Sequence, residues 1–334
     1  MNTRTLTSQN NIADDFVMPF QTEQSGVTGR LIRLGATVDT VLTRHGYADD
    51  VGAALGEALV LTALSGSALK FDGRLILQTK TDGPLGLIVA NYDVPGKLRA
   101  YARCDGKDLG RREGETATDV QRRLIGSGHL ALTIDPGQGM ERYQGIVALD
   151  DSTLTEAALG YFRQSEQLPT FIRIAVARHF ANGQWTWRAG GLMVQRVAST
   201  GGTERPDLTD EDRDARLHGE DHEDWIRTRM LAETVEDHEL LDPTLDPHRL
   251  LYRLFHEEGV RAREPQPLSA ECRCSRERIK SVLTNFSATD LSDMREPDGA
   301  VAVTCEFCST VYRFQPEDLA DDLTDDLADN QIQP

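Results

Sequence analysis

The chain contains no apolar run that could cross a membrane as a helix. No stretch of its 334 residues approaches the ~20 consecutive apolar residues that a transmembrane helix needs. The segment from Met1 to Asp15 is polar and lacks the apolar core of a secretory signal. The sequence also shows no internal repeat. These absences predict a soluble, cytoplasmic protein that does not associate with membranes.

Basic residues are scarce, because 36 Lys and Arg stand against 54 Asp and Glu and give a net charge of −18. Most of the excess lies in two segments. Thr203–Asp224 holds ten acids and three arginines, and Glu317–Asp329 holds seven acids and no base. An acidic surface repels phosphate backbones, so nucleic acid is not expected as a partner. Acidic segments also keep a protein soluble when apolar surface is exposed.

Cysteines are few, and the five present are too sparse for a disulfide-stapled secreted scaffold. Four of them form two close pairs near the C-terminus, Cys272-Arg-Cys274 and Cys305-Glu-Phe-Cys308, with 30 residues between the pairs. Four thiolates at about 2.3 Å from one ion complete a tetrahedral zinc site, and each short pair can hold the metal from one tight loop. The sequence therefore predicts one Zn²⁺ per chain, bound by these four cysteines.

The same four cysteines allow two interpretations. A four-cysteine zinc site is more often a purely structural knuckle. Thiolates are also the form of cysteine that reacts with oxidants, and bound zinc keeps all four sulfurs in this form. Oxidation would eject the metal, and a small metal-dependent fold would lose a contribution on the order of 10 to 16 kcal/mol. A structural knuckle and a redox switch both fit the residues alone.

The hydrophobic pattern predicts a mixed α+β domain over residues 15–197. A helix is expected at Tyr47–Lys70, where apolar residues recur at helical spacing, and another at Thr153–Gln164. Short β-prone runs separated by turn residues predict a set of hairpins, with Asn182-Gly183 as a strong turn signal. The predicted strands are Arg74–Thr81, Leu85–Tyr92, Lys97–Arg103, His129–Asp135, Gln144–Leu149, Phe171–Phe180 and Gln184–Met193.

A change of composition at Ser199 predicts the end of this domain. Residues 198–264 are expected to form an acidic, partly helical linker. One amphipathic helix is predicted at Trp225–Leu241, with Ile226 and Met230 among its apolar residues. A second begins with Asp246 as N-cap and stops at Gly259. Residues 1–14 are expected to be a flexible N-terminus.

The remaining residues are divided into a zinc module and a tail. The module is predicted to span residues 265–316, and an acidic disordered tail residues 317–334. Within the module, Ser275 is expected to cap a helix, and short strands are predicted before and after the second cysteine pair. The residues expected on the buried side of that helix are Ile279, Val282, Leu283 and Phe286.

Other residues with chemical potential are assigned structural roles. Cys104 follows a strand, and a lone cysteine is usually a small packed hydrophobe. His218 and His222 have the i, i+4 spacing of a metal pair, but they lie in a polar acidic run that is typical of a solvated segment. No catalytic site is predicted from these residues.

Two further features are weighed in the same way. Ser165, which precedes Glu166 and Gln167, is interpreted as part of a corner between a helix and a strand rather than as an active-site serine. Trp185 and Trp187 share one face of a predicted strand, where a core or interface role fits at least as well as a binding surface.

Seven segments of the chain carry a resemblance to a known family. They occur in the family's order from about Arg30 to Phe314. The segments are Phe71-Asp-Gly73 with Gln78 and Gly83-Pro84, Gly128-His-Leu130, Tyr143-Gln-Gly145, Tyr161-Phe-x-Gln-Ser-Glu-Gln-Leu-Pro-Thr170, Ala189-Gly-Gly191 with Gln195, Cys272-Arg-Cys-Ser-Arg-Glu-Arg278, and Thr304-Cys-Glu-Phe-Cys308 followed by Tyr312 and Phe314. The chain resembles the 33-kDa heat-shock protein family of bacteria, which are redox-regulated holdase chaperones.

The resemblance implies a mechanism without enzymatic turnover or ATP. The reduced, zinc-bound protein would be inactive. Oxidative stress would form the disulfides Cys272–Cys274 and Cys305–Cys308 and release zinc. The module and linker would then unfold and expose apolar surface that binds unfolding client proteins, and the active form would be a homodimer. The acidic linker stretch and the acidic tail are longer than the family pattern, and they are expected to keep the active form soluble.

Two alternatives remain at this point. A thiol-disulfide oxidoreductase could use Cys305 and Cys308, but no βαβ pattern surrounds this pair as it does in thioredoxin-like enzymes. A zinc-knuckle binding protein for nucleic acid would need a basic and aromatic groove, which the acidic composition opposes.

Overall fold

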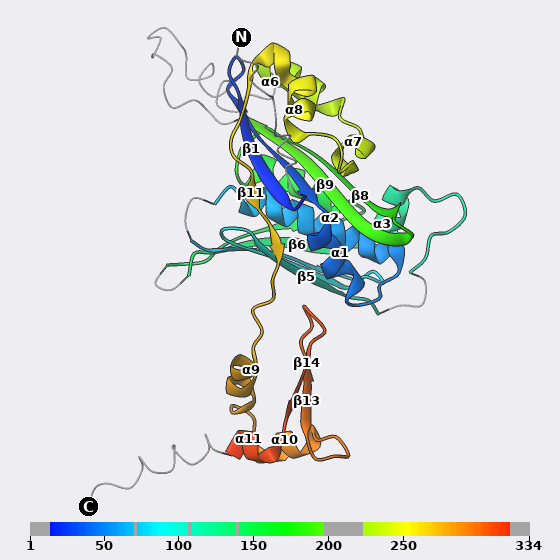
Figure 1. The fold of residues 1–334 in the computed structure, drawn as a ribbon, viewed down its shortest axis with the longest axis vertical. Helices are drawn as coiled ribbons and strands as arrows, with labels where there is room; N and C mark the ends of the chain where they lie inside the picture. The colour runs from blue at the N-terminus through cyan, green and yellow to red at the C-terminus, as the bar shows by residue number, and fades with distance from the viewer. Residues whose placement is uncertain (1–13, 70–71, 106–108, 138–139, 197–222, 321–334) are drawn as a thin grey trace, which may run out of the picture. The chain divides into compact units, whose positions relative to one another are not determined.

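The computed structural model describes residues 14–69, 72–105, 109–137, 140–196 and 223–320 (Figure 1). The chain divides into two compact units between Ala270 and Glu271. The expected flexible N-terminus, except for Asp14, lies outside the described residues, as do the histidine pair at 218 and 222 and most of the two acidic segments. Residues 317–320 of the expected disordered tail are described and lie in helix α11. Among the residues described, no helix has both the length and the apolar character needed to span a membrane.

The first unit contains two six-stranded sheets. Sheet A has the strand order β10-β1-β2-β9-β8, and β11 also pairs with β1. All of its strand pairs are antiparallel. The strands of sheet A are β1 Phe16–Thr22, β2 Val27–Leu34, β8 Thr170–Ala181, β9 Gln184–Arg196, β10 Val260–Ala262 and β11 Gln266–Pro267.

Sheet B is built from the predicted meander. Its strand order is β12-β5-β4-β3-β6-β7, in which only β12 runs parallel to its neighbour β5. The strands of sheet B are β3 Arg74–Thr81, β4 Leu87–Asp93, β5 Lys97–Arg103, β6 Gly128–Asp135, β7 Tyr143–Ala148 and β12 Ser269–Ala270. The seven predicted strands of the first domain are all present, and the α+β class is confirmed.

Sequence reasoning missed several elements at the edges of this framework. It assigned nothing to β1, β2, α1 (Ala36–Thr43) or α3 (Ala117–Ile125). The β8–β9 hairpin was found because its turn has a local cause. Asn182 and Gly183 both have positive φ, at 51° and 79°, as a tight two-residue hairpin turn requires. The missed strands β1 and β2 also pair as a hairpin, but the residues that connect them, 23–26, contain no Asn-Gly or Asp-Gly pair to mark the turn.

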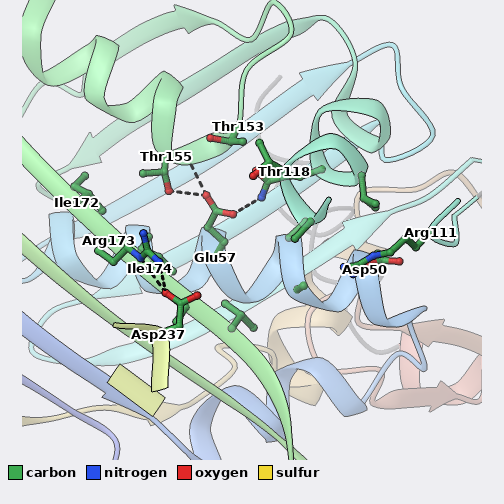
Figure 2. A pocket seen from close by; sticks show the side chains of 17 residues that line it. Asp50, Glu57, Arg111, Thr118, Thr153, Thr155, Ile172, Arg173, Ile174 and Asp237 are labelled. Carbon is green, nitrogen blue, oxygen red and sulfur yellow. Dashed lines mark hydrogen bonds and ion pairs between the residues drawn. The ribbon is translucent and has the colours of Figure 1, made fainter. Parts of the chain in front are cut away.

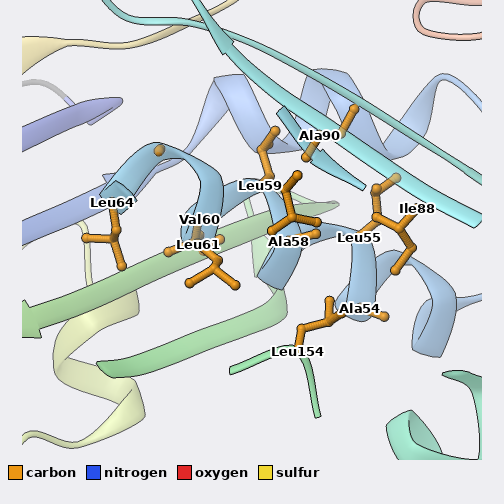
Figure 3. Packing of buried hydrophobic residues seen from close by; sticks show 14 of the residues in the cluster. Ala54, Leu55, Ala58, Leu59, Val60, Leu61, Leu64, Ile88, Ala90 and Leu154 are labelled. Atoms are coloured by element: carbon orange, nitrogen blue, oxygen red, sulfur yellow. The ribbon is translucent and has the colours of Figure 1, made fainter. Parts of the chain in front are cut away.

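Helix α2, Asp49–Gly66, lies between the two sheets and forms the centre of the unit (Figures 1 and 3). Thirteen of its 18 residues are buried, on all sides of the helix. A helix that is apolar all round is expected only where protein surrounds it. Its leucines and alanines pack against Ile88 and Ala90 of sheet B and, together with Leu154 at the start of α4 (Leu154–Gln164), join one continuous core (Figure 3).

Two adjacent glycines let β9 pass between helices at close range. A Cβ atom at Gly191 would overlap the side chain of Val60 on α2. A Cβ atom at Gly190 would instead overlap the backbone carbonyl of Leu240, which belongs to α7 (Asp237–Leu241). Neighbouring strand residues face opposite sides of a sheet, so each glycine admits a helix on its own side.

The described part of the predicted linker covers the outer face of sheet A. Helices α6 (Glu223–Glu233), α7 and α8 (Pro247–Phe255), followed by a 3₁₀ turn at His256–Glu258, lie on the side opposite α2 (Figure 1). Their buried residues include Trp225, Leu250 and Phe255, which form a second core with residues of β1, β2 and β9. The Arg227–Glu258 ion pair joins α6 to the 3₁₀ turn. This segment is therefore a packed layer of the first unit.

Two expectations for the linker were wrong in detail. The single helix predicted at Trp225–Leu241 is two helices, separated at residues 234–236. Ile226 is exposed, and Met230 is 62% exposed. Trp225, Thr228 and Ala232 face the sheet instead, because the packing of the large Trp225 ring sets the rotation of α6.

The division between the units also falls later than the expected module start at residue 265. β11 hydrogen-bonds to β1, and β12 hydrogen-bonds to β5. Residues 266–270 therefore close both sheets of the first unit. Short extended segments of this kind carry no sequence signal of their own, because their partners are distant in the chain.

The second unit has a small core. It consists of α9 Arg276–Leu283, α10 Ala288–Asp293, β13 Val301–Thr304, β14 Val311–Phe314 and α11 Pro316–Ala320. Its buried cluster is limited to Leu283, Leu291, Val301, Phe314 and Leu319. The cap at Ser275 and the two strands were predicted correctly. Val282 and Phe286, however, are exposed, because so small a unit offers α9 only a narrow surface, which Ile279 and Leu283 cover.

Replacing a leucine at the centre of α2 should strongly destabilise the first unit. Leu59 is fully buried between the sheets, so Leu59→Ala is expected to lower the free energy of unfolding by about 2–5 kcal/mol. Met230→Ala, at an exposed site, should change it by less than about 0.5 kcal/mol. Urea denaturation followed by tryptophan fluorescence measures both. Equal effects of the two substitutions would contradict the central role of α2.

Candidate metal centre

Four cysteine side chains meet in the second unit. Cys272 and Cys274 lie in the segment that leads into α9, and Cys305 and Cys308 lie in the turn between β13 and β14. Their Sγ atoms all lie within 4.8 Å of one another. All five cysteines of the chain are free thiols. The fold therefore brings together two pairs that are 30 residues apart in the sequence.

The spacing of the sulfurs matches a tetrahedral ligand set. Cys272 Sγ and Cys305 Sγ are 3.7 Å apart, and Cys274 Sγ and Cys308 Sγ are 3.3 Å apart. A tetrahedron with metal–sulfur distances of about 2.3 Å has edges of about 3.8 Å. The four side chains can therefore reach one central ion with little adjustment.

Local backbone structure fixes the second pair. The N–H of Cys305 donates to the carbonyl of Thr310 at 2.9 Å, and the N–H of Ser309 donates to the carbonyl of Cys305 at 2.8 Å. Ser309 adopts a positive φ of 56°, which lets the chain reverse between β13 and β14. Cys305 and Cys308 are held at the two ends of this tight turn.

Helix α9 fixes the first pair from the other side. The Ser275 side chain accepts a hydrogen bond from the N–H of Arg278 at 3.2 Å and so ends the extended segment directly after Cys274. Arg276 stacks over the ring of Phe314, 4.5 Å from its centroid, and donates to Asp318 at 2.8 Å. This side chain ties the beginning of α9 to β14 and α11, next to the cysteines.

Two hydroxyl groups contact the sulfurs, and sequence reasoning assigned no role to either. The Tyr312 hydroxyl donates to Cys274 Sγ at 3.2 Å, and the Thr310 hydroxyl lies 3.2 Å from Cys308 Sγ. Both residues follow the second cysteine pair within four positions, and the alternation of β14 sends Tyr312 back toward the first pair. Only this strand geometry identifies them.

The four thiols cannot all ionise without a cation. Partial burial raises the pKa of Cys274 to about 12, although the hydrogen bond from Tyr312 acts in the opposite direction. Burial also acts to raise the pKa of Cys308, but hydrogen bonds with Thr310 and with the neighbouring cysteines outweigh it and lower this pKa to about 6. Because like charges at this separation repel, one thiolate suppresses the others. A divalent cation would remove this conflict, so the site fits a bound metal.

The remaining candidates are placed apart from this cluster. Cys104 is half-buried against the main core, and burial raises the pKa of its thiol, as a packed cysteine should behave. Ser165 is the C-cap of α4, and Glu166 accepts a hydrogen bond from Tyr161 at 2.6 Å. The interpretation of Ser165 as part of a structural corner is confirmed.

The two tryptophans have separate surroundings. Trp187 is 4% exposed and packs beside α2, where a Cβ atom at Gly52 would touch its ring. Trp185 is 57% exposed and packs against Phe180 with a distance of 5.1 Å between ring centroids. Trp187 is a core residue, whereas Trp185 belongs to an exposed aromatic pair at the end of the β8–β9 hairpin.

Comparison with known proteins gives consistent matches over most of the chain. The family model described as Hsp33 protein matches residues 15–315. The 33 kDa chaperonin of Caulobacter vibrioides strain NA1000 is 42% identical over 305 residues, which cover 91% of this chain and 96% of that protein. The 33 kDa chaperonin of Ectopseudomonas mendocina is 37% identical over 308 residues, covering 92% and 94% respectively.

A solved structure shares the fold. The crystal structure of the 33 kDa chaperonin, a heat shock protein 33 homologue, from Thermotoga maritima aligns with a TM-score of 0.71 at 22% identity. The alignment covers 95% of this chain and all of that one. With the fold, the four-cysteine cluster and the family match taken together, the chain belongs to the Hsp33 family of chaperones.

Proposed function

We propose that the protein is a redox-regulated, ATP-independent holdase whose zinc site controls access to an apolar surface. One observation carries the proposal: four thiols lie within 4.8 Å of one another in a unit whose buried hydrophobic cluster, among the residues described, comprises five side chains. A unit this small needs additional stabilisation, for which a metal site is a common source. The same sulfurs can be oxidised, so one cluster can both stabilise the unit and release it.

Zinc is the expected ion, because four thiolates in a tetrahedral arrangement are a typical zinc ligand set. When bound, the ion would supply the positive charge that allows all four sulfurs to remain thiolates. Cys272, Cys274, Cys305 and Cys308 would hold one ion per chain in the reduced state. The Tyr312 hydroxyl would keep donating to the Cys274 thiolate.

The oxidation step joins sulfurs within each short pair. Cys272 with Cys274, and Cys305 with Cys308, each give up two electrons and form one S–S bond. Each pair reduces one hydrogen peroxide and, with two protons, yields two waters. The disulfide sulfurs would no longer carry the negative charge needed to hold a divalent cation. Pairing within each motif separates the two halves of the cluster, whereas cross-pairing would keep them tied together.

The surface to be uncovered is the outer face of sheet A. Met18, Phe20, Leu31 and Val194 on this face are buried in the second core together with residues of α6, α7 and α8. The chain continues from β12 directly into the segment that holds Cys272. Unfolding that spreads from the metal unit through β12, β11 and β10 would break the strand pairs that hold the chain after α8 on the two sheets. The linker helices would then be released. The exposed face would then bind unfolding client proteins, in a cytoplasmic homodimer.

The cysteine pairs provide the first test of the metal site. Cys272→Ser or Cys308→Ser should abolish stoichiometric zinc binding, because three thiolates and a hydroxyl bind zinc far more weakly than four thiolates. Cys104→Ser removes one thiol as well and should retain one zinc per chain. Metal content of the purified reduced proteins, measured with a chromophoric chelator, distinguishes these outcomes. Zinc retained at full stoichiometry by both ligand variants would contradict the assignment.

Oxidation should couple zinc release to chaperone activity. Treatment with peroxide and mild heat should consume four thiols, release one zinc per chain and suppress aggregation of a thermally unfolded client. Mapping of the disulfides should find them within each motif. Zinc release without any gain in aggregation suppression would refute the chaperone switch. Catalytic reduction of insulin disulfides would instead favour an oxidoreductase.

The linker can be tested without touching the metal site. Gly190→Ala places a methyl group against the Leu240 carbonyl and should weaken the contact of α7 with sheet A by about 1–3 kcal/mol. The zinc-loaded variant should become more sensitive to proteolysis in residues 223–255 and should suppress aggregation without full oxidation. Gly160→Ala is the control, since its nearest neighbour, Val147 Cγ2, would be 3.7 Å away. If the zinc-loaded Gly190→Ala protein behaved as wild type, the proposal that release of the linker activates the chaperone would be contradicted.

A further inference from the structure

A groove of about 430 Å³ runs beside strand β8 in the first unit (Figure 2). Residues 172–176, five consecutive positions of β8, line it. Lining by consecutive residues means that the groove follows the backbone edge of the strand and not one face of it. β8 is the terminal strand of sheet A, so the groove lies where a further strand would be added.

The backbone of β8 presents free hydrogen-bonding groups to this groove. The N–H of Arg196 donates to the carbonyl of Pro169, which sets the alternation of the β8–β9 ladder. The N–H and C=O groups of Ile172, Ile174 and Val176 consequently point away from β9. Within the described parts of the chain, no hydrogen bond reaches these outward groups.

The opposite wall of the groove is suited to a strand lying over a helix. Ala53 and Glu57 of α2 line it, together with residues at the beginnings of α3 and α4 such as Thr118 and Thr155 (Figure 2). The side chains of β8 that face α2 already pack on the main core. A strand added beside β8 would also pack on α2, and its side chains would lie over the small Ala53.

The charges in the groove leave one carboxylate without a cationic partner among the described residues. Arg173 pairs with Asp237 at 2.7 Å, and Arg111 pairs with Asp50 at 3.3 Å. Glu57 instead accepts hydrogen bonds from the Thr155 hydroxyl at 2.6 Å and the Thr155 N–H at 3.1 Å, and another from Gln121.

A basic side chain of a bound segment would complement Glu57. Burial raises the pKa of this carboxyl, as expected of an acid with no cation beside it.

The edge ends at the exposed aromatic pair. The rings of Phe180 and Trp185 pack in a tilted arrangement at the far end of the β8–β9 hairpin. Phe180 shares the strand face of Ile174 and Val176 because it lies an even number of residues away. An extended segment that leaves the groove in this direction would meet apolar surface. The edge of β8 thus leads from the groove toward the aromatic pair.

We propose that an extended segment of an unfolded client protein binds here by adding a strand to β8, with a basic residue opposite Glu57. This inference rests on the proposed holdase function and names one of its client-binding sites. Adding a strand to a sheet edge gives affinity through the backbone, so it tolerates many sequences. Such tolerance is what a chaperone of many unfolded proteins requires. The Arg173–Asp237 ion pair connects β8 to α7 at the groove, so release of the linker would widen the groove.

The binding test uses the oxidised full-length protein and a synthetic peptide. The peptide alternates Val and Thr over ten positions with one central Lys. Two matched peptides carry either Glu in place of Lys or N-methyl groups on alternate amides along one edge. The first peptide should bind and slow hydrogen exchange at the amides of Ile172, Ile174 and Val176. N-methylation should weaken binding by at least about tenfold, because it removes several backbone hydrogen bonds. The Glu peptide should also bind more weakly.

A matched pair of variants tests the edge itself. Ile174→Pro removes one outward N–H of β8 and should reduce peptide binding at least about tenfold. Ile146→Pro removes an outward N–H from β7, the free edge of sheet B, and should leave binding unchanged. If either variant misfolds, the proposal is still tested by the slower hydrogen exchange that the peptide should cause at Ile172, Ile174 and Val176 in the unsubstituted protein.

Three outcomes would overturn the inference. One is client protection by the oxidised protein without slower exchange at Ile172, Ile174 and Val176. Another is equal affinity for the N-methylated peptide. The third is protection of these amides by rising protein concentration alone, which would assign the edge to a second copy of the chain. In each case zinc release and aggregation suppression remain as measured, so the proposed function would stand. Loss of both activities would refute that function instead.

Discussion

The burial of α2 on all sides is the constraint on which the first unit depends. An 18-residue helix with thirteen buried positions cannot fold against one sheet alone. It requires sheet A on one side and sheet B on the other. Sheet A joins strands from both ends of the unit, and sheet B is completed by β12 from its C-terminal end. β1 and β10 are separated by more than 200 residues, yet they pair in sheet A. The core therefore makes the unit cooperative over its whole length.

The second unit, in contrast, has little buried apolar surface to hold it together. In its described part, a hydrophobic cluster of five buried side chains gives little apolar stabilisation, and its most concentrated feature is a group of four thiols. These thiols repel each other when ionised and attract one another only through a shared cation or through bonds. A fold that depends on such a cluster responds to its chemical state, whereas the large core around α2 contains no such cluster among its residues.

The described linker belongs energetically to the first unit. Trp225, Leu250 and Phe255 bury the outer face of sheet A, and β10 and β11 extend that sheet by hydrogen bonds. The close approach of Leu240 to Gly190 shows how tightly α7 fits. This layer covers apolar surface that would otherwise be exposed, so it can serve as a removable cover. The edge of β8 lies beside it, and no described residue hydrogen-bonds to the outward groups of that edge even when the layer is in place.

Local sequence determined much of this protein. The spacing of Cys272, Cys274, Cys305 and Cys308 predicted the metal cluster, because two short pairs must converge on one ion. Asn182-Gly183 predicted a hairpin, and Asp246 and Ser275 predicted helix starts, because turns and caps are set by a few adjacent residues. The family resemblance, carried by separate short segments, was confirmed by the comparisons.

Tertiary structure alone decided the rest. The rotation of α6, the exposure of Val282 and the inclusion of residues 266–270 in the sheets depend on partners distant in the chain. The role of Tyr312 depends on which cysteine its strand faces, and the groove beside β8 exists only because that strand ends a sheet. Hydrophobic and hydrogen-bonding groups have many possible partners in a sequence, and only the fold selects among them.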